Sequence, residues 1–356
     1  MLIDVFKGDA FTMSSLTDLI NLAPHQPGRI TELGYFDEEG VSTTTIQIER
    51  THSGLNLVSN MPRGGVVNNV NAEKRDVTPF IVPHLPQDAT IYAEEIQNLR
   101  AAGSESDTEA MTTYVGQRLA RMRRNLDATM EHHRISALQG KVLDADGTTV
   151  ITDLFAAFNI TQQTLAMDLD TDGTDVLARS IQGKRLSENA LGNVNVSGYR
   201  VFCSDSFFDA LVSHPKVEAA YQRWNDGAFL RDDNRGGFSF GGNIVWENYR
   251  GKVGAVDFIA DDHAIMVPEG VMDLNICKFA PADTMSAVGT MGLPYYAMQE
   301  ILRMDKGVEL AAQSNPANLC TRPDAIIRLG LSSTVTPNVA GAEQTMDAKA
   351  SGKKKK

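Results

Sequence analysis

The sequence predicts an α+β fold, and three observations lead to this class. Apolar and polar residues alternate with a period of two in VSTTTIQIER at 41–50, which is typical of a strand. One long helix is predicted over 105–140. From 199 to 305, short strands alternate with a helical piece, without the regular βαβ order of a doubly wound sheet.

The N-terminal residues 1–40 predict an arm. They carry two short apolar clusters, LTDLINLA and ITELGYF, on either side of the turn-rich APHQPGR. Two such clusters are too few to close a core of their own. We therefore expect this segment to pack against other parts of the protein.

The segment 60–86, NMPRGGVVNNVNAEKRDVTPFIVPHLP, lies between predicted strands and is not typical of a core. Its polar part, 60–76, is longer than the roughly 12–15 residues of an ordinary connection. A phosphate-binding loop is excluded because no strand-to-helix glycine turn surrounds the Arg-Gly-Gly. The prolines at 79, 83 and 86 remove ladder donors, so this chain is expected at a sheet edge or extended on a neighbouring subunit.

The helix over 105–140 is the clearest predicted element, because apolar residues recur at steps of three and four. A capping box at Ser106-x-x-Glu109 starts it, and Gly140 ends it. At about 1.5 Å per residue it spans roughly 50 Å, which is typical of a spine. Its arginines predict a solvated or subunit-contacting basic face: Arg118, Arg121, Arg123, Arg124 and Arg134.

The remaining elements follow in mixed order. A hairpin is predicted around Asp146-Gly147, and helices are predicted over 153–167 and 175–192. YRVFCS, NIVWENY, AVDFIA and AIMVPEG predict strands, with a helical piece at SFFDALVSHPKVEAAYQRW. Two more apolar strands are predicted within 309–332, around a turn of proline and asparagine.

Composition restricts the class of protein. The 356 residues carry a net charge of −12, and so acidic a body disfavours tight binding of nucleic acid. No run approaches the roughly 18 apolar residues of a membrane span, so we expect a soluble, unsecreted chain with no membrane partner. The three cysteines are far apart, form no C-x-x-C pair and are expected to be buried, reduced thiols.

No catalytic or metal site is predicted. Ser239 matches G-x-S-x-G, but a strand rather than a helix follows it, so a serine hydrolase is the weaker alternative. Asp168 opens a calcium-loop pattern whose twelfth position is Arg179, not the required glutamate. His132 and His133 point about 100° apart on a helix and cannot bind one metal ion together. We therefore expect no enzyme activity and no cofactor.

Several short motifs, in their order and spacing, resemble a known family. They are Arg63-Gly64-Gly65, Val82-Pro83-His84, GQRLARMRRNLDATMEHHRISALQGK, the strands GNIVWENY and AIMVPEG, and AAQSNPANLCTRPDAIIRL. From about 40 to 332 the chain resembles the major capsid proteins of lambda-like tailed bacteriophages, the protein E family. The resemblance implies the Hong Kong 97-type capsid fold.

The resemblance also implies a domain organisation. Residues 1–45 would be the N-terminal arm and 46–90 the extended E-loop. A P-domain with the spine helix 105–140 would span 91–165 and close with strands in 306–334. Residues 166–305 would form the A-domain, and 335–356 a C-terminal tail.

The implied function is that of a structural subunit that self-assembles into hexamers and pentamers of an icosahedral head around double-stranded DNA. Scaffolding protein, portal and a decoration protein are the implied partners, with assembly in the host cytoplasm and the virion as final location. An encapsulin-like compartment shell is the alternative within this fold.

Lys74 lies where some capsids of this fold carry a cross-linking lysine, but the lambda-like branch is not known for that bond. Candidate inter-subunit contacts are Arg63, Gly64, Gly65, Lys74, Arg75, Pro83, His84, Arg121 and Arg124.

Overall fold

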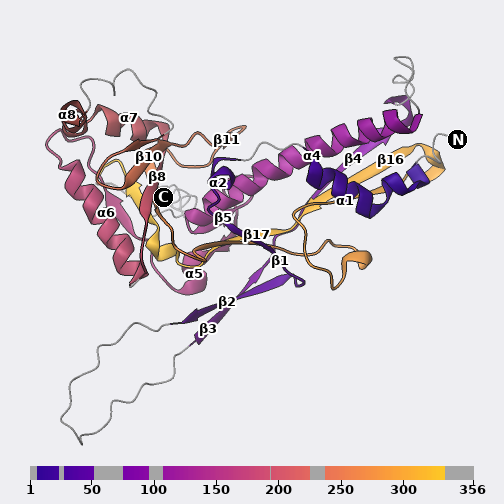
Figure 1. Cartoon of the computed structure of the whole chain (residues 1–356), viewed down its shortest axis with the longest axis horizontal. Coiled ribbons are helices and arrows are strands. Elements are labelled where there is room, and N and C mark those ends of the chain that lie inside the picture. The colour runs from indigo at the N-terminus through magenta and orange to yellow at the C-terminus, as the bar shows by residue number, and fades with distance from the viewer. Residues whose placement is uncertain are drawn as a thin grey trace, which may run out of the picture. The chain divides into compact units, whose positions relative to one another are not determined.

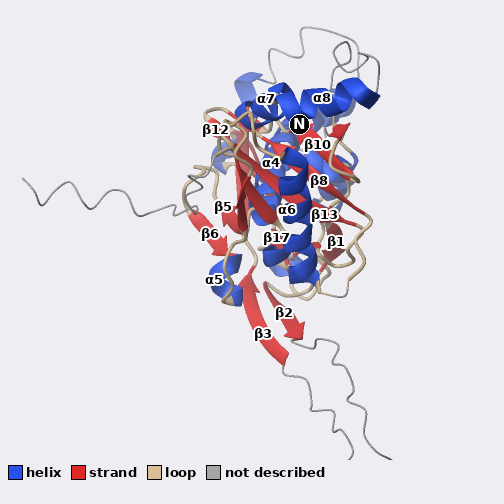
Figure 2. Ribbon diagram, turned by 90° about the vertical axis from the view of Figure 1, so that its left-hand side faces the viewer, coloured by secondary structure: helices blue, strands red, loops and turns tan. Residues whose placement is uncertain are grey.

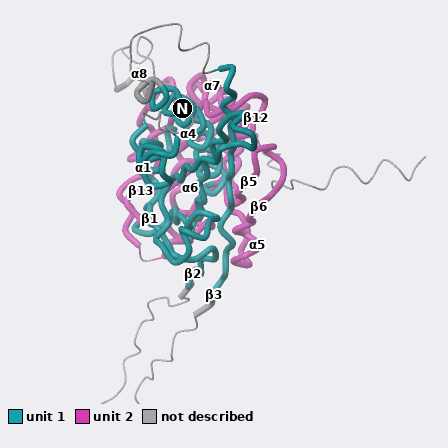
Figure 3. The backbone as a smooth tube through the Cα atoms, turned by 90° about the vertical axis from the view of Figure 1, so that its right-hand side faces the viewer, with its two compact units in different colours: residues 1–138, 272–321 teal, residues 139–271, 322–356 magenta. Residues whose placement is uncertain are grey.

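The computed structural model describes residues 6–23, 28–51, 75–95, 107–192, 194–224 and 237–332. Contacts divide the chain into two compact units, coloured separately in Figure 3. Unit 1 comprises residues 1–138 and 272–321, and unit 2 comprises residues 139–271 and 322–356. Helices and strands occur in both units, which confirms the α+β class.

Unit 1 is built around the long helix α4 (Asp107–Leu138) and two three-stranded sheets. One sheet has the order β15 (Tyr296–Ile301), β16 (Gly307–Ser314), β4 (Leu85–Tyr92), and all its pairs are antiparallel. The other has the order β1 (Asp37–Gly40), β14 (Asn275–Phe279), β17 (Pro316–Cys320). Only Asn315 separates β16 from β17, so the chain passes from one sheet to the other at that residue.

The apolar stripe of α4 faces these sheets, as its periodicity predicts. The helix packs on β16, β17 and β4. Burying large side chains of this kind contributes about 1.5–3 kcal/mol each, which fixes the helix on the sheets. The buried stripe comprises Met111, Val115, Leu119, Met122, Leu126 and Met130.

The N-terminal segment folds onto unit 1. A 3-10 turn (Asp9–Phe11) leads into α1 (Met13–Leu22), and α2 (Arg29–Glu32) follows. Helix α1 packs on β15 and α4 through Leu16 and Ile20, whose side chains are fully buried. The prediction that this segment packs on other parts of the protein is confirmed.

A two-stranded antiparallel ribbon leaves unit 1 after β1. It consists of β2 (Thr45–Thr51) and β3 (Arg75–Ile81), with Thr45 opposite Ile81 and Thr51 opposite Arg75 (Figure 1). Pro79 lies in this ribbon and Pro86 in β4, the outer strand of its sheet. The prediction that these prolines occupy sheet edges is confirmed.

Unit 2 contains a mixed six-stranded sheet in the order β7-β18-β13-β8-β10-β9. Strand β8 is parallel to β10 and antiparallel to β13, and β18 is parallel to β7. One face carries the core, with Val201, Trp246 and Met266 fully buried, and α6 packs there (Figure 2). The bounds of the strands are β7 (Thr164–Ala166), β8 (Gly198–Cys203), β9 (Phe238–Ser239), β10 (Ile244–Asn248), β13 (His263–Glu269) and β18 (Ile327–Gly330).

The helices of unit 2 are α5 (Leu154–Phe158), α6 (Val176–Leu191), α7 (Asp205–Ser213) and α8 (Pro215–Trp224). The predicted hairpin is β5 (Lys141–Leu143) with β6 (Val150–Asp153), and Gly147 has the positive φ that its turn requires. Short pieces complete the unit: β11 (Lys252–Val253), β12 (Val256–Asp257) and a 3-10 turn (Pro323–Ala325).

Two sequence-based expectations were wrong at the level of single elements. The helix expected over 153–167 is only α5, because Asn159 adopts a left-handed conformation (φ 50°) that ends it, and β7 follows. The single helical piece at 206–224 is two helices, since Pro215 starts α8 after an extended His214.

Candidate assembly surfaces

The β2–β3 ribbon has two different faces. Ile46, Ile48 and Phe80 point to one face and are buried. Because side chains alternate along a strand, Val77, Pro79 and Ile81 occupy the opposite face of β3, and all three are exposed. The period-two pattern in the sequence thus produces an outer apolar stripe with no cover in the described part of the chain.

Seven predicted contact residues belong to the segment 60–86, which includes β3 of this ribbon. Arg63, Gly64, Gly65 and Lys74 lie outside the described residues. Arg75 is the first residue of β3. Pro83 is half-buried after the ribbon, and His84 Nδ1 lies 2.8 Å from Asn315 Oδ1, at the junction of the two sheets of unit 1.

The arginines of α4 do not form one solvated face. Arg121 and Arg124 are exposed, as expected for a contact surface. Arg123 and Arg134 are buried instead, which corrects the prediction for these two residues. Their guanidinium groups hold the N-terminal segment inside unit 1.

Arg123 closes the C-terminal end of α1. Its Nη1 donates to the carbonyl oxygens of Ile20, Asn21 and Ala23 at 2.7, 2.7 and 2.6 Å. A helix leaves its last carbonyls without intrahelical partners, and its C-terminus favours a positive charge. One buried cation therefore satisfies both the hydrogen bonding and the dipole of α1.

The ring of Tyr295 lies beneath this cation, with the Arg123 guanidinium carbon 4.9 Å from its centroid. The Tyr295 hydroxyl donates to the Asp127 carboxylate one turn along α4. Burial, together with the hydrogen bond and the charge of Asp127, raises the pKa of Tyr295 well above its usual value, so this phenol remains a proton donor.

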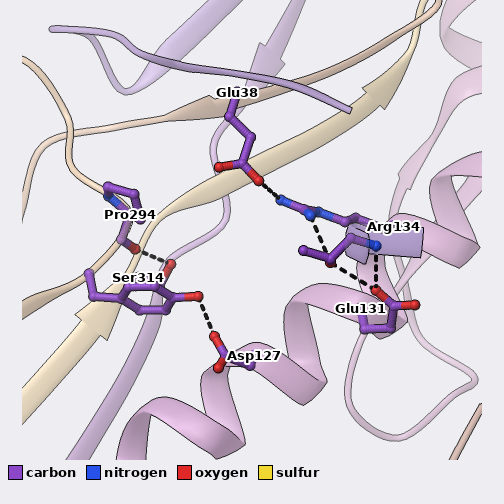
Figure 4. A network of polar contacts seen from close by, with 8 residues as sticks. Glu38, Asp127, Glu131, Arg134, Pro294 and Ser314 are labelled. Atoms are coloured by element: carbon purple, nitrogen blue, oxygen red, sulfur yellow. Dashed lines mark hydrogen bonds and ion pairs between the residues drawn. The ribbon is translucent and has the colours of Figure 1, made fainter. Parts of the chain in front are cut away.

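Glu131 caps the N-terminal end of α2 with a negative charge, whereas Arg123 caps the C-terminal end of α1 with a positive one (Figure 4). Its carboxylate accepts from the backbone N–H of Ile30 at 2.7 Å and from the Thr31 hydroxyl at 3.0 Å. Arg134 then donates to the same Thr31 hydroxyl at 2.8 Å and to Glu38 at 2.5 Å. The charges of α4 thus match both helices of the N-terminal segment.

A second exposed apolar surface lies on residues 281–294, between β14 and β15. The short 3-10 turn η6 (Met285–Ala287) lies within it. Met285, Val288 and Met291 are 94%, 74% and 61% exposed. We call these residues, 281–294, the apolar loop.

The weaker chemical candidates do not form sites. Ser239 ends the two-residue β9, and β10 follows it without a helix, so the nucleophile turn of a hydrolase is not formed. Arg179 pairs with Asp168 at 2.6 Å. Among the described residues, no group of three or more His, Cys, Asp or Glu side chains could hold a metal ion, and no helix is long and apolar enough to cross a membrane.

The cysteines are buried, as predicted. Burial raises the pKa of Cys277 to about 12 and the pKa of Cys203 well above its usual value. Since the thiolate is the reactive form, burial and a raised pKa both disfavour reaction at Cys203 and Cys277.

Sequence reasoning missed the apolar loop and the buried charges. The sequence signal for the buried charges was Arg123, Asp127 and Glu131 at four-residue spacing, which a solvated helix face also shows. No periodic signal distinguishes the exposed methionines of the apolar loop from core methionines.

Two relatives of the chain are major capsid proteins of bacteriophages. The major capsid proteins of Salmonella phage Felix O1 and Pseudomonas phage KPP10 are each 27% identical to the chain, covering 89% of it and 95% and 96% of their own lengths. Two similar solved structures are the capsids of cyanophage P-SCSP1u and bacteriophage PhiM1. Their TM-scores are both 0.49, with 12% and 14% identity, 83% and 85% of this chain covered, and 86% of each of those chains covered.

Residues 12–331 match the family described as phage major capsid protein E. The match spans most of the chain, including the N-terminal helices, the ribbon and both units. Members of this family assemble with themselves into the capsid shells of tailed phages. The chain belongs to the phage major capsid protein E family.

Proposed function

We propose that this capsid protein forms hexamers and pentamers of an icosahedral head that encloses double-stranded DNA. The observation that carries the proposal is the β2–β3 ribbon. It pairs with no other strand of the described chain and exposes Val77 and Ile81 on its outer face. An exposed apolar stripe on a strand pair of this kind is typical of a protein interaction site.

The proposed domains follow the family. They are the N-terminal arm (1–45), the E-loop (46–90), the P-domain (91–165 and 306–334), the A-domain (166–305) and the C-terminal tail (335–356). The ribbon belongs to the E-loop, which lies on a neighbouring subunit. Because the contact joins two different surfaces, it is heterologous and closes rings of subunits.

The proposed contact residues cluster in the E-loop and on the exposed side of α4. The first group adds backbone pairing and buried area, and the second adds charge. They are Arg63, Gly64, Gly65, Lys74, Arg75, Pro83, His84, Arg121 and Arg124.

The role is structural and without turnover. A net charge of −12 repels the phosphates of packaged DNA, so the shell encloses DNA without sequence-specific binding. Scaffolding, portal and decoration proteins are the proposed partners, and assembly takes place in the host cytoplasm.

Negative-stain microscopy of the purified chain, with and without the scaffolding protein, tests this function. We expect rings of five and six subunits and closed shells. A chain that stays monomeric in every condition, while its circular dichroism shows a folded protein, would contradict the proposal.

A further inference from the structure

The apolar loop (281–294) presents its apolar side chains from a fixed frame. Gly292 N–H donates to the Val41 carbonyl at 2.9 Å, and Leu293 N–H donates to the Tyr296 hydroxyl at 2.9 Å. Its ends are tied to the junction of β16 and β17, where Ser314 donates to the Pro294 carbonyl and Asn315 to the Pro281 carbonyl, at 2.7 and 2.8 Å. The loop is therefore ordered before any partner arrives.

The inner side of the loop is a small core, formed by Ala282, Ala287 and Tyr296 with Met13 packed against them. Close backbone contact seals it, because a Cβ on Gly292 would lie 1.9 Å from the Phe279 carbonyl oxygen. Met285 and Met291 are not members of this small core and are exposed in the folded loop.

The polar side chains of the tip are the uncharged hydroxyls of Thr284, Ser286 and Thr290. The segment TMSAVGTMGLP at 284–294 contains no charged residue. An ordered, uncharged surface with two methionines suits an apolar partner, because the flexible thioether side chain adapts to the shape of what it meets.

The same chain carries another exposed apolar surface. On the outer face of the ribbon, Val77 and Ile81 are 50% and 79% exposed, and Pro79 lies between them. This stripe lies on a strand, whereas the apolar loop contains only a short 3-10 turn. Two different apolar surfaces on one self-assembling chain fit a heterologous contact, in which each covers the other in the next copy.

We propose that the apolar loop is the binding site for the ribbon of a neighbouring copy. In this site, which we call the seat, Ile81 and Val77 pack against Val288, Met285 and Met291. This inference rests on the proposed assembly into shells and names the partner surface of the ribbon. A contact of the loop with the same loop in another copy would leave the ribbon stripe uncovered.

Cross-linking in assembled shells tests the seat. The full chain carries Ile81→Cys and Val288→Cys together, is assembled, and is treated with a bismaleimide, which joins two thiols by adding each to one maleimide. The native cysteines are buried and give little background. We expect a ladder of covalent oligomers on a denaturing gel from the double variant, and only monomers from each single variant. Leu177→Cys on α6, also exposed, replaces Val288→Cys as the matched control and is expected to give no ladder.

The outcomes separate the seat from the assembly itself. Shells that form but give no ladder overturn the seat and leave the proposed function intact. Dimers from Val288→Cys alone also overturn it, because they indicate a loop-to-loop contact. Absence of shells from the wild-type chain contradicts the proposed function instead.

A charge pair covers the case in which the cysteine variants do not assemble. Ile81→Lys and Val288→Asp are each expected to reduce the yield of shells at least tenfold, and the double variant to recover most of it. Single variants that assemble like the wild type overturn the seat.

Discussion

The Glu131 carboxylate lies 2.7 Å from the backbone nitrogen of Ile30 and closes the N-terminus of α2. The two residues are 101 positions apart, so this bond holds the N-terminal segment to the spine helix. Gly28 is required beside it, because a Cβ there would lie 2.1 Å from the Glu131 side chain. The N-terminal segment is thus fixed by charge as well as by apolar packing.

Glu131→Gln tests this attachment. The amide keeps the shape of the side chain but removes the charge of the group that accepts from the Ile30 N–H and from the Thr31 hydroxyl. We therefore expect a loss of about 1–3 kcal/mol in the free energy of unfolding. Hydrogen exchange of residues 28–36 should accelerate. Glu32→Gln, on the exposed side of α2, is the control: it removes only an exposed ion pair with Arg29 and should change both quantities far less. Equal exchange rates in both variants would contradict the attachment.

Arg123→Lys tests the closure of α1. A lysine carries the charge but cannot reach three carbonyls in the planar geometry of a guanidinium, so we expect a loss of about 1–3 kcal/mol in the free energy of unfolding, measured by denaturant titration. Arg124→Lys is the matched control, since the neighbouring side chain is exposed. Two variants of equal stability would show that Arg123 does not hold α1.

Gly116→Ala tests whether α4 is stable through packing alone. A Cβ at this position meets only Leu19 Cδ2, at 3.9 Å, so it fits without strain. Removing the conformational freedom of a mid-helix glycine should raise the free energy of unfolding by about 0.5–1 kcal/mol. A decrease in the melting temperature would indicate that α4 is not a continuous helix at this position.

His263 predicts a pH dependence of unit 2. Burial, together with the charge of Arg328, lowers the pKa of His263 in the folded state below its usual 6.5. The neutral imidazole is therefore favoured by folding, and its contribution is present above about pH 6.5 and is lost as the pH falls through the folded-state pKa. Between pH 7.5 and 5, we expect the free energy of unfolding to decrease less steeply for His263→Asn than for the wild type. Identical slopes would contradict this assignment, since the other histidines are the same in both proteins.

Local patterns predicted the elements well, because their causes lie within the elements. The stripe from Met111 to Met130 predicted α4, and the alternation in VSTTTIQIER predicted β2. The order of the sheets could not be predicted, since β16 pairs with β4, more than two hundred residues earlier. A left-handed Asn159 likewise depends on tertiary packing and ended a helix that propensity alone would continue.

The candidate surfaces were predicted only in part. Prolines in 79–86 indicated an edge or an arm, and Arg121 and Arg124 are exposed as expected. Arg123 was not recognised as buried, because its role depends on carbonyl oxygens at the end of α1, such as that of Ile20, 103 positions earlier. The apolar loop was missed because exposure of a methionine depends on what the rest of the fold leaves uncovered.

We propose that the E-loop (46–90) is needed for assembly and not for folding. Sedimentation velocity of a variant lacking residues 64–74, beside the wild type, tests it most directly. The deletion leaves residues 52–63 to join the paired strand ends Thr51 and Arg75, so the ribbon can still close. We predict shells from the wild type and only folded, slowly sedimenting subunits from the deletion variant. Shells of normal size from the deletion variant would contradict the claim.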